Sequence, residues 1–298
     1  MTKTQHLESG VMDDLQLPPA ERILKIRSPR WIGYTRAKQI LGKLNDLFTY
    51  PKTHRMPNLL LVGDTNNGKT MIANRFKRLH PADDDPGGAG VWVPVLSVQA
   101  PPVPDENRFY NLILDRLFAP YRAQSRVDQK QHQVMTLLKR VDLKMLIIDE
   151  IQHILAGTSL KQRHFLNTIK FLGNELQIPI VGVGTKEAFN ALQSDPQLAN
   201  RFEPAILPKW EPNEEYLKLL ASFERMLPLQ KPSQLTKEDL AMKILALSEG
   251  TIGEISSLLT AAAVEAVNSG TERITLSTFQ KISWTPPSNR KWRSSQFA

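Results

Sequence analysis

Gly63-Asp64-Thr65-Asn66-Asn67-Gly68-Lys69-Thr70 is the most informative part of this 298-residue chain for its fold class. It matches the pattern G-x-x-x-x-G-K-[ST], and it lies between a short apolar run, 59–62, and a segment with helical periodicity, 69–79. Glycines at both ends allow such a loop to wrap with its backbone N–H groups pointing inward, and the N-terminus of the following helix adds partial positive charge. We therefore expect all eight residues of this phosphate loop (63–70) to bind a nucleotide, with Lys69 reaching the β- and γ-phosphates and the Thr70 hydroxyl holding Mg²⁺.

Short apolar runs alternate with longer helical patterns around this loop. The runs that predict strands are 58–62, 91–98, 145–149, 178–183 and 205–207, and helical periodicity covers 69–79, 108–118, 126–141 and 160–176. This alternation is typical of an α/β fold whose parallel sheet is covered by helices on both faces. After Trp210 the patterns are helical, over 214–227, 236–247, 252–267 and 276–282, and they predict a second, all-helical domain.

The expected domain organisation has four parts. Residues 1–20 are polar without a periodic apolar pattern and predict a flexible arm, while 21–210 form the α/β core and 211–284 the helical domain. The segment 285–298 contains two prolines and then Arg290-Lys291-Trp292-Arg293 without an acidic residue. It predicts a flexible basic tail that binds nucleic acid or docks a protein partner.

Two adjacent acidic residues end the strand predicted at 145–149. Asp149 and Glu150 would lie at the carboxyl edge of the sheet, where open α/β sheets bind nucleotides. Together with a phosphate loop, the pair favours Asp149 as a ligand in the Mg²⁺ shell and Glu150 as the general base that polarises an attacking water, which indicates nucleotide hydrolysis. Solvated residues at the end of a strand are the alternative interpretation.

Two further residues are candidates for reading the γ-phosphate. Thr185 follows the buried run 179–184 and could sense the phosphate or orient the water, while capping the helix that begins at Lys186 is an equally good interpretation. Arg201 precedes the last predicted strand and could reach the nucleotide of a neighbouring subunit, a contact worth roughly 10³–10⁵ in rate where it operates. An ordinary surface arginine is the alternative.

The order of these elements resembles that of the AAA+ ATPases, and several stretches resemble one branch of them, the TniB/TnsC-like transposition ATPases of mobile elements. The resemblance extends from about Arg22 to Ala266. Besides the phosphate loop, it is carried by Arg30-Trp31-Ile32-Gly33-Tyr34-Thr35-Arg36-Ala37 and by the stretches 146–153, 172–176, 181–185, 197–202, 207–210 and 249–255.

The resemblance implies a five-stranded AAA+ sheet in the order 5-1-4-3-2 with a helical lid. It implies an ATP-dependent homo-oligomer, a ring or a filament, that coats double-stranded DNA largely without sequence preference, recruits an integrase-like transposase and is dissolved by ATP hydrolysis. A target-selection adaptor protein is a further candidate partner. The resemblance also implies that Trp31, Ile32 and Tyr34 line the adenine side of the pocket, although ordinary packing at a domain edge explains such a run equally well.

The sequence departs from the family pattern in the predicted lid. Many AAA+ lids present an arginine to the γ-phosphate shortly after the glycine that begins a lid helix, but here Gly253 is followed by Glu254 and no arginine is near in the sequence. We therefore expect Thr185 and Arg201 to carry more of the γ-phosphate reading, and hydrolysis to be slow.

Composition limits the remaining functions. The chain has 38 Lys and Arg against 30 Asp and Glu, a net charge of +8, and no cysteine, so disulfides, thiolate metal sites and a cysteine nucleophile are excluded. Nine basic and two acidic residues fall in 21–55, which concentrates +7 of the charge just before the phosphate loop. No apolar run reaches eighteen residues, so we expect a cytoplasmic protein without a membrane partner. The resemblance implies that it is bacterial and encoded by a mobile element. We expect no metal other than Mg²⁺.

A protein that coats DNA needs cations on its surface, because neutralising phosphates dominates the affinity. The candidates are Arg108, Arg122, Arg126 and Lys130, which follow the second predicted strand with Tyr110 and Tyr121 interleaved. A solvated helix face is the alternative interpretation. Two other functions stay open, an AAA+ helicase loader or remodelling ATPase and a nucleotide-gated protein-interaction switch that binds no nucleic acid.

Overall fold

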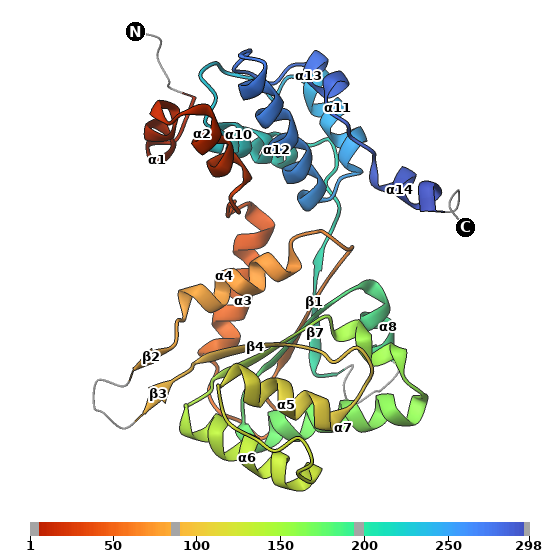
Figure 1. Ribbon diagram of the computed structural model, residues 1–298. Helices are drawn as coiled ribbons and strands as arrows, with labels where there is room; N and C mark the ends of the chain where they lie inside the picture. Colours follow the sequence, from red (N-terminus) through yellow and green to blue (C-terminus); the bar gives the residue numbers. More distant parts are fainter. Residues whose placement is uncertain (1–5, 85–89, 194–199, 295–298) are drawn as a thin grey trace. The chain divides into compact units, whose positions relative to one another are not determined.

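The computed structural model describes residues 6–84, 90–193 and 200–294 (Figure 1). Its contacts divide the chain into two units. The helical unit comprises residues 6–35, 66–68 and 208–294, and the sheet unit comprises the described residues of 36–65 and 69–207. The boundary passes through the phosphate loop, so that its tip, Asn66–Gly68, groups with the helical unit.

The sheet unit is built on five parallel strands. They are β1 (Asn58–Gly63), β4 (Val95–Gln99), β5 (Met145–Asp149), β6 (Ile180–Gly184) and β7 (Phe202–Leu207), in the spatial order β4-β5-β6-β1-β7. Counted along the chain, this is the expected order 5-1-4-3-2 read from the opposite edge. The α/β fold class with its parallel sheet is thereby confirmed, and β1, which leads into the phosphate loop, is buried along its whole length.

One predicted strand is divided in the structure. Residues 91–98 were expected to form a single strand, but Val91–Trp92 forms β3, which pairs antiparallel with β2 (Asp83–Asp84), and β4 begins only at Val95. Pro94 separates the two, because proline has no N–H to donate to a strand ladder. Its carbonyl still accepts hydrogen bonds from the N–H groups of Lys144 and Met145, which aligns β4 with β5.

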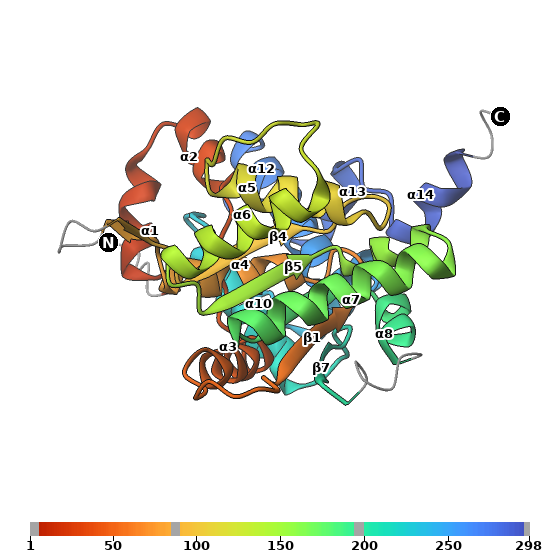
Figure 2. The same cartoon turned by 90° about the horizontal axis from the view of Figure 1, so that it is seen from below.

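Helices cover both faces of the sheet (Figure 1). On one side lie α3 (Thr35–Phe48) and α4 (Lys69–Leu79). On the other lie α5 (Glu106–Arg116), α6 (Val127–Arg140) and α7 (Ser159–Leu176), which Figure 2 shows across the sheet. Alternate strand residues point to opposite faces, and Leu60 and Leu96 accordingly share one core with Phe109 and Phe165 from the helices. The 3-10 helix η2 (Ile151–Ala156) follows β5, and α8 (Lys186–Gln193) follows β6.

The helical unit has a core of its own. Its helices after the sheet are α10 (Glu214–Met226), α11 (Glu238–Ser248), α12 (Ile252–Asn268), α13 (Leu276–Lys281) and α14 (Pro287–Ser294). Side chains of α10, α11, α12 and α13 bury one continuous apolar cluster, in which Leu220 and Leu258 are fully buried. None of the described residues forms a helix both long and apolar enough to cross a membrane.

The N-terminal segment differs from the expected flexible arm. Residues 9–27 form α1 (Ser9–Met12), the 3-10 helix η1 (Asp13–Gln16) and α2 (Pro19–Arg27), and Ile26 is fully buried in the core of the helical unit. Leu7 is also buried, and the Glu8 N–H donates to the Arg225 carbonyl. Such short elements contribute too few apolar residues each for a period to show, so sequence periodicity could not reveal them. Residues 1–5 lie outside the described part of the chain.

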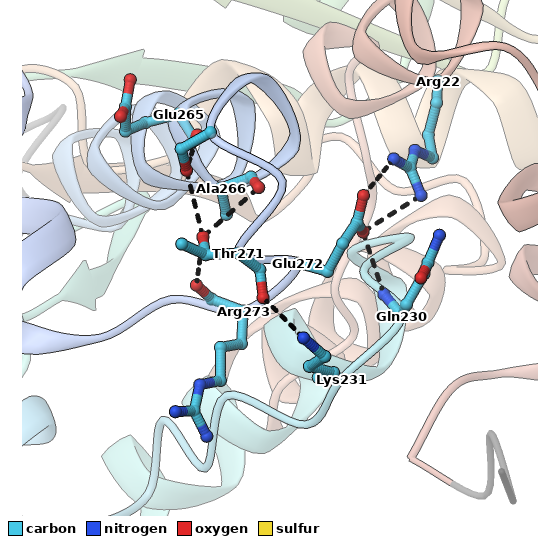
Figure 3. A network of polar contacts seen from close by, with 9 residues as sticks. Arg22, Gln230, Lys231, Glu265, Ala266, Thr271, Glu272 and Arg273 are labelled. Atoms are coloured by element: carbon cyan, nitrogen blue, oxygen red, sulfur yellow. Dashed lines mark hydrogen bonds and ion pairs between the residues drawn. The ribbon is translucent and has the colours of Figure 1, made fainter.

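A buried ion pair ties α2 to the rest of the helical unit (Figure 3). The guanidinium of Arg22 donates to both carboxylate oxygens of Glu272, at 3.1 and 2.5 Å, and the two side chains are only 4% and 10% exposed. Glu272 also accepts from the Gln230 N–H at 3.2 Å. A two-pronged arginine to carboxylate contact adds geometric specificity to the attraction, so this pair sets where α2 lies in its unit.

Candidate nucleotide-binding site

The lysine of the phosphate loop is held inside the sheet unit at the end of β1. Its ammonium donates to the carbonyls of Gly63 at 2.9 Å and Asp64 at 2.7 Å, and the side chain is 8% exposed. Burial lowers the pKa of Lys69, and the carboxylates of Glu150, Asp149 and Asp64, in that order, act against this shift. The charge of Lys69 is therefore placed at the mouth of the loop and within the field of the acidic pair.

The tip of the loop turns through two left-handed residues. Asn66 has a φ of 59° and Gly68 a φ of 82°. Asparagine is one of the few residues that adopt this conformation readily, and glycine adopts it at no steric cost. Left-handed residues that alternate with others along the backbone turn successive N–H groups toward one side and make the concave turns that bind anions, which is the conformation the G-x-x-x-x-G pattern predicts.

The two predicted Mg²⁺ ligands come together in the sheet unit. Thr70 is the second residue of α4. Its hydroxyl donates to Asp149 Oδ2 at 2.8 Å, although the two residues are 79 positions apart in the sequence. A carboxylate and a hydroxyl are hard oxygen ligands, which suit Mg²⁺, an ion that usually takes one or two carboxylates and completes its shell with phosphate and water. No group of three or more His, Asp or Glu side chains among the described residues is arranged to hold a metal. The Thr70 hydroxyl and the Asp149 carboxylate fit Mg²⁺ by their chemistry, and its binding there stays a prediction.

Glu150 is separated from Asp149 by a turn of the backbone. It adopts the left-handed conformation, with φ 55° and ψ 38°, and its N–H donates to Asp149 Oδ1 at 2.9 Å. Non-glycine residues held in this region cluster at functional sites, because the surrounding structure must compensate their strain. The Glu150 carboxylate accepts from Gln152 Nε2, whereas Asp149 accepts from Thr70, so the two acids have distinct partners.

Gln152 is a site residue that the sequence reasoning did not single out. Its Oε1 atom is buried and has no hydrogen-bond partner among the described residues. A Cβ at Gly184, the last residue of β6, would lie 2.8 Å from this oxygen, so the glycine makes room for the amide. The only signal in the sequence is the glycine directly before Thr185.

Thr185 lies at the same edge of the sheet as the phosphate loop, because Gly184 pairs with Val62 of β1. Its carbonyl accepts from the Ala188 N–H at 3.1 Å, and a hydrogen bond with its hydroxyl lowers the pKa of Glu187. Thr185 thus stands at the start of α8 in the manner of a helix cap. Capping and proximity to the phosphate loop are both features of this position.

Arg201 lies at the amino ends of the strands, opposite the carboxyl ends where the phosphate loop lies. Its Nη1 donates to Asn174 Oδ1 at 2.8 Å, and its carbonyl accepts from the Asn58 N–H at the start of β1. A strand rises about 3.3 Å per residue, so Arg201 is about 20 Å from the loop that follows Gly63. An arginine side chain cannot span that distance, and Arg201 therefore cannot serve the phosphate loop of its own chain. Residues 194–199, just before it, lie outside the described part.

The predicted adenine-side residues belong to the helical unit. Ile32 and Tyr34 pack against its apolar core, and the ring of Tyr34 meets that of Trp210 edge to face, with centroids 5.1 Å apart. Trp31 is half-buried beside them. Their packing role is thus visible, and contact with adenine stays a prediction.

Three of the four predicted DNA-binding residues are exposed, and the fourth is not. Arg108, Arg122 and Arg126 lie at the surface of the sheet unit. Lys130 is 1% exposed, donates to Asn107 Oδ1 at 2.8 Å and to the Ala123 carbonyl at 3.0 Å, and has its ammonium 5.4 Å from the centre of the Tyr121 ring. This corrects the expectation for Lys130, because its buried ammonium binds Asn107 and the Ala123 carbonyl within the protein and does not face a DNA phosphate.

The same segment carries an exposed aromatic residue that the sequence reasoning missed. Phe118 is 95% exposed and has a φ of 52°, which is uncommon for a bulky residue. It lies between α5 and α6, in the same segment as Arg122. Its spacing gave no signal, because a single phenylalanine near the end of an amphipathic helix predicts burial.

Comparison with known proteins gives a family and a fold. The family model described as bacterial TniB protein matches residues 22–212. A structure of the ORC2 protein of Aeropyrum pernix in ADPNP and ADP complexes is similar with a TM-score of 0.61 and 15% identity, over 86% of this chain and 70% of that one. No curated protein sequence matches the chain.

Two further solved structures have the same fold. The ORC1 protein of Aeropyrum pernix in complex with DNA has a TM-score of 0.55 at 15% identity, covering 87% of this chain and 67% of its own. Cdc6p from Pyrobaculum aerophilum has a TM-score of 0.55 at 18% identity, covering 84% and 67%. At these identities the likeness shows the fold alone, the parallel α/β arrangement described above.

Proposed function

This chain belongs to the TniB family, and from that premise we propose that it is an ATP-dependent, DNA-binding AAA+ regulator of DNA transposition. In this proposal it binds ATP with Mg²⁺, forms a homo-oligomer on double-stranded DNA and recruits or activates an integrase-like transposase, with a target-selection adaptor as a further partner. ATP hydrolysis then disassembles the complex. The observation that carries the nucleotide part is the hydrogen bond between Thr70 and Asp149, which joins the end of the phosphate loop to the end of β5.

The residues of the sheet unit divide the ATPase chemistry among themselves. Lys69, which donates to its loop carbonyls, would bind the β- and γ-phosphate oxygens, and Thr70 and Asp149 would hold Mg²⁺, which would neutralise charge on the phosphates. Glu150 accepts a proton from the attacking water. Gln152 donates to the Glu150 carboxylate and thereby orients that carboxylate. Thr185, at the same sheet edge, bonds the γ-phosphate or the water.

The position of Arg201 is an argument for the oligomer. This residue lies about 20 Å from its own phosphate loop, at the amino end of β7, so it can act on a nucleotide only when a second copy presents its loop to that edge. Contacts that run head to tail in this way build rings when the rotation closes and helical filaments when it does not. A ring or a helical filament would each suit a protein that coats DNA.

The surface near α5 and α6 supports DNA as the partner. Arg108, Arg122 and Arg126 are exposed there, and Phe118 is in the same segment as Arg122. Their guanidinium groups offer phosphate contacts, which position a protein on DNA without reading its sequence. That one of the proteins with the same fold was solved in complex with DNA is consistent with this choice of partner.

Binding to labelled duplex DNA at several salt concentrations, with and without ATP and Mg²⁺, tests the proposal. We expect ATP to promote duplex binding and the affinity to fall steeply with salt. Replacing Arg108, Arg122 and Arg126 together by Ala should reduce the slope of log affinity against log salt by up to about 3. The matched control replaces the exposed Lys237, Lys243 and Arg273 of the helical unit.

Two results would contradict the proposal in different ways. Equal or tighter binding of the corresponding single strand favours the helicase-loader alternative. No binding to either DNA in the presence of ATP favours a protein-interaction switch without nucleic acid.

A further inference from the structure

The tip of the phosphate loop caps a helix of the helical unit. The first N–H groups of a helix lack partners within it and need acceptors from elsewhere. Thr251 precedes α12, but within the described structure its side chain does not cap the helix. The Ile252 N–H instead donates to Asn67 Oδ1 at 3.4 Å, and the Gly253 N–H donates to the Asn66 carbonyl at 2.9 Å. All of these residues belong to the helical unit, so the loop tip and the start of α12 form one structural element.

Gly253 and Glu254 hold Asn66 from two sides. A Cβ at Gly253 would lie 2.0 Å from Asn66 Oδ1 and 2.6 Å from its carbonyl oxygen, so only glycine permits this approach. The next residue, Glu254, is 8% exposed and accepts from Asn66 Nδ2 at 2.9 Å. The backbone and the side chain of the loop tip are therefore both bonded to the first turn of α12.

The buried carboxylate of Glu254 is neutralised from far along the chain. Arg290 of α14 donates from Nη1 to Oε1 at 2.9 Å and from Nη2 to Oε2 at 2.7 Å. The guanidinium also lies over the Trp284 ring, 5.1 Å from its centre, and its Nε donates to the Thr285 carbonyl. The hydrogen bonds to Glu254 raise the pKa of Arg290. The position next to Gly253 that lacks an arginine in sequence thus has one in space.

A continuous chain of bonds therefore connects the loop tip with the C-terminal helix. Asn66 bonds Glu254, and Glu254 bonds Arg290. A second contact, from the Ser288 N–H to Glu249 Oε1 at 2.8 Å, fixes the start of α14 independently. The Arg290 side chain still has partial access to solvent, since its exposure is 45%, so a partner bound to α14 can reach the pair.

We propose that Glu254 and Arg290 are positioning residues that form a latch between the phosphate loop and α14, so that ATP binding and the docking of α14 favour each other. This rests on the proposed function, because it requires that the loop binds ATP. The latch holds Asn66 in the left-handed conformation that the loop needs. By linkage, the free energy by which a docked α14 strengthens ATP binding equals the free energy by which bound ATP strengthens the docking of α14. A protein partner that pulls α14 away would then weaken ATP binding.

The experiment measures both directions of this coupling on the full chain. The affinity for a fluorescent ATP analogue with Mg²⁺ is determined, and hydrogen exchange of the loop tip and of α14 is followed with and without ATP. The variants are Arg290→Ala, Glu254→Gln, their combination and Arg290→Lys. Arg273→Ala, an exposed arginine of the same unit, is the matched control.

We expect Arg290→Ala to weaken ATP binding about five- to tenfold, at the lower end of usual coupling strengths. Without ATP its loop-tip amides should exchange faster than in the wild type. In the wild type ATP should slow exchange in α14, and this response should vanish in Arg290→Ala. Arg290→Lys should keep part of the effect, because a lysine preserves the charge but not the two-pronged contact. The double variant should be no worse than the worse single variant, and Arg273→Ala should resemble the wild type.

The latch would be overturned, and the proposed function left standing, by unchanged ATP affinity in folded Arg290→Ala. The same would follow if the wild type binds ATP but hydrogen exchange in its α14 does not change. A wild-type chain that binds no ATP would overturn the proposed function and the latch with it. Should Arg290→Ala fail to fold, Arg290→Lys and Glu254→Gln decide. Weaker ATP binding and a smaller α14 response to ATP in these variants support the latch, whereas wild-type ATP affinity and wild-type α14 exchange in both overturn it.

Discussion

At the scale of single residues, Asp149 and Glu150 are adjacent in sequence and have different partners in space. Asp149 ends β5 in line with the sheet and accepts from Thr70, while the left-handed turn at Glu150 sends the next carboxylate to Gln152. Lys69 is placed among these groups by two carbonyls of its own loop. Adjacent acids with separate partners can hold separate roles, one toward the metal and one toward water.

Glu150→Gln tests this division of roles. Gln is nearly isosteric, so Mg²⁺ and ATP should bind as in the wild type, but the amide cannot accept a proton from water. We expect the hydrolysis rate to fall by about 10²–10⁴-fold, the usual contribution of a general base. A phosphate-release assay and a separate measurement of ATP affinity check this.

Glu175→Gln, which changes an exposed carboxylate of α7, is the control and should leave the rate unchanged. Hydrolysis by Glu150→Gln at the wild-type rate would show that another group activates the water.

At the scale of elements, local patterns predicted more than long-range contacts did. The run 58–62, the loop and the helix 69–79 were predictable together because periodicity, glycine spacing and helix start agree within one short stretch. Lys130 was misread because a lysine on an amphipathic helix has the same local pattern whether water or Asn107 and Ala123 surround it. Arg290 beside Glu254 could not be foreseen, because 36 residues separate the two and their contact depends on how α14 folds back.

The position of the N-terminal helices likewise depends on a contact between residues far apart in sequence, the buried ion pair of Arg22 and Glu272. Arg22→Met removes one partner and leaves a buried carboxylate without its counter-ion, which typically costs about 3–5 kcal/mol. We expect the free energy of unfolding of the helical unit to fall by that order. Chemical denaturation of the full chain measures it.

The double variant Arg22→Met, Glu272→Gln removes the unpaired charge and should be less destabilised than Arg22→Met alone. A double variant at least as unstable as the single would mean that the carboxylate is not the source of the cost.

At the scale of the whole molecule, the proposed catalytic residues lie at opposite ends of the strands, so that under the proposed function one copy alone would not complete the chemistry. The phosphate loop follows the carboxyl end of β1, whereas Arg201 precedes β7 at the amino edge of the same sheet. The family resemblance indicated oligomers on DNA, and the position of Arg201 supplies a physical reason for them. Which surfaces meet between copies is a property of the assembly and could not be predicted from one sequence.

Mixing two inactive variants tests whether Arg201 acts in trans. Arg201→Ala and Glu150→Gln should each lose most ATPase activity, Arg201→Ala by roughly 10³-fold or more. In an equimolar mixture about a quarter of the head-to-tail contacts join an intact Glu150 to an intact Arg201 of the next copy, so activity should return to about that fraction.

Light scattering must show that mixed assemblies form on DNA. If they form without any return of activity, Arg201 does not act across subunits.

In the proposed function, ATP bound at the phosphate loop gates assembly on duplex DNA, and direct imaging tests this gating most simply. The wild type and Lys69→Ala are viewed by negative-stain electron microscopy with duplex DNA, with and without a non-hydrolysable ATP analogue. We predict rings or filaments only for the wild type and only when both DNA and the analogue are present. Equal assemblies without the analogue or with Lys69→Ala, or no assemblies under any condition, would show that ATP at the phosphate loop does not gate assembly.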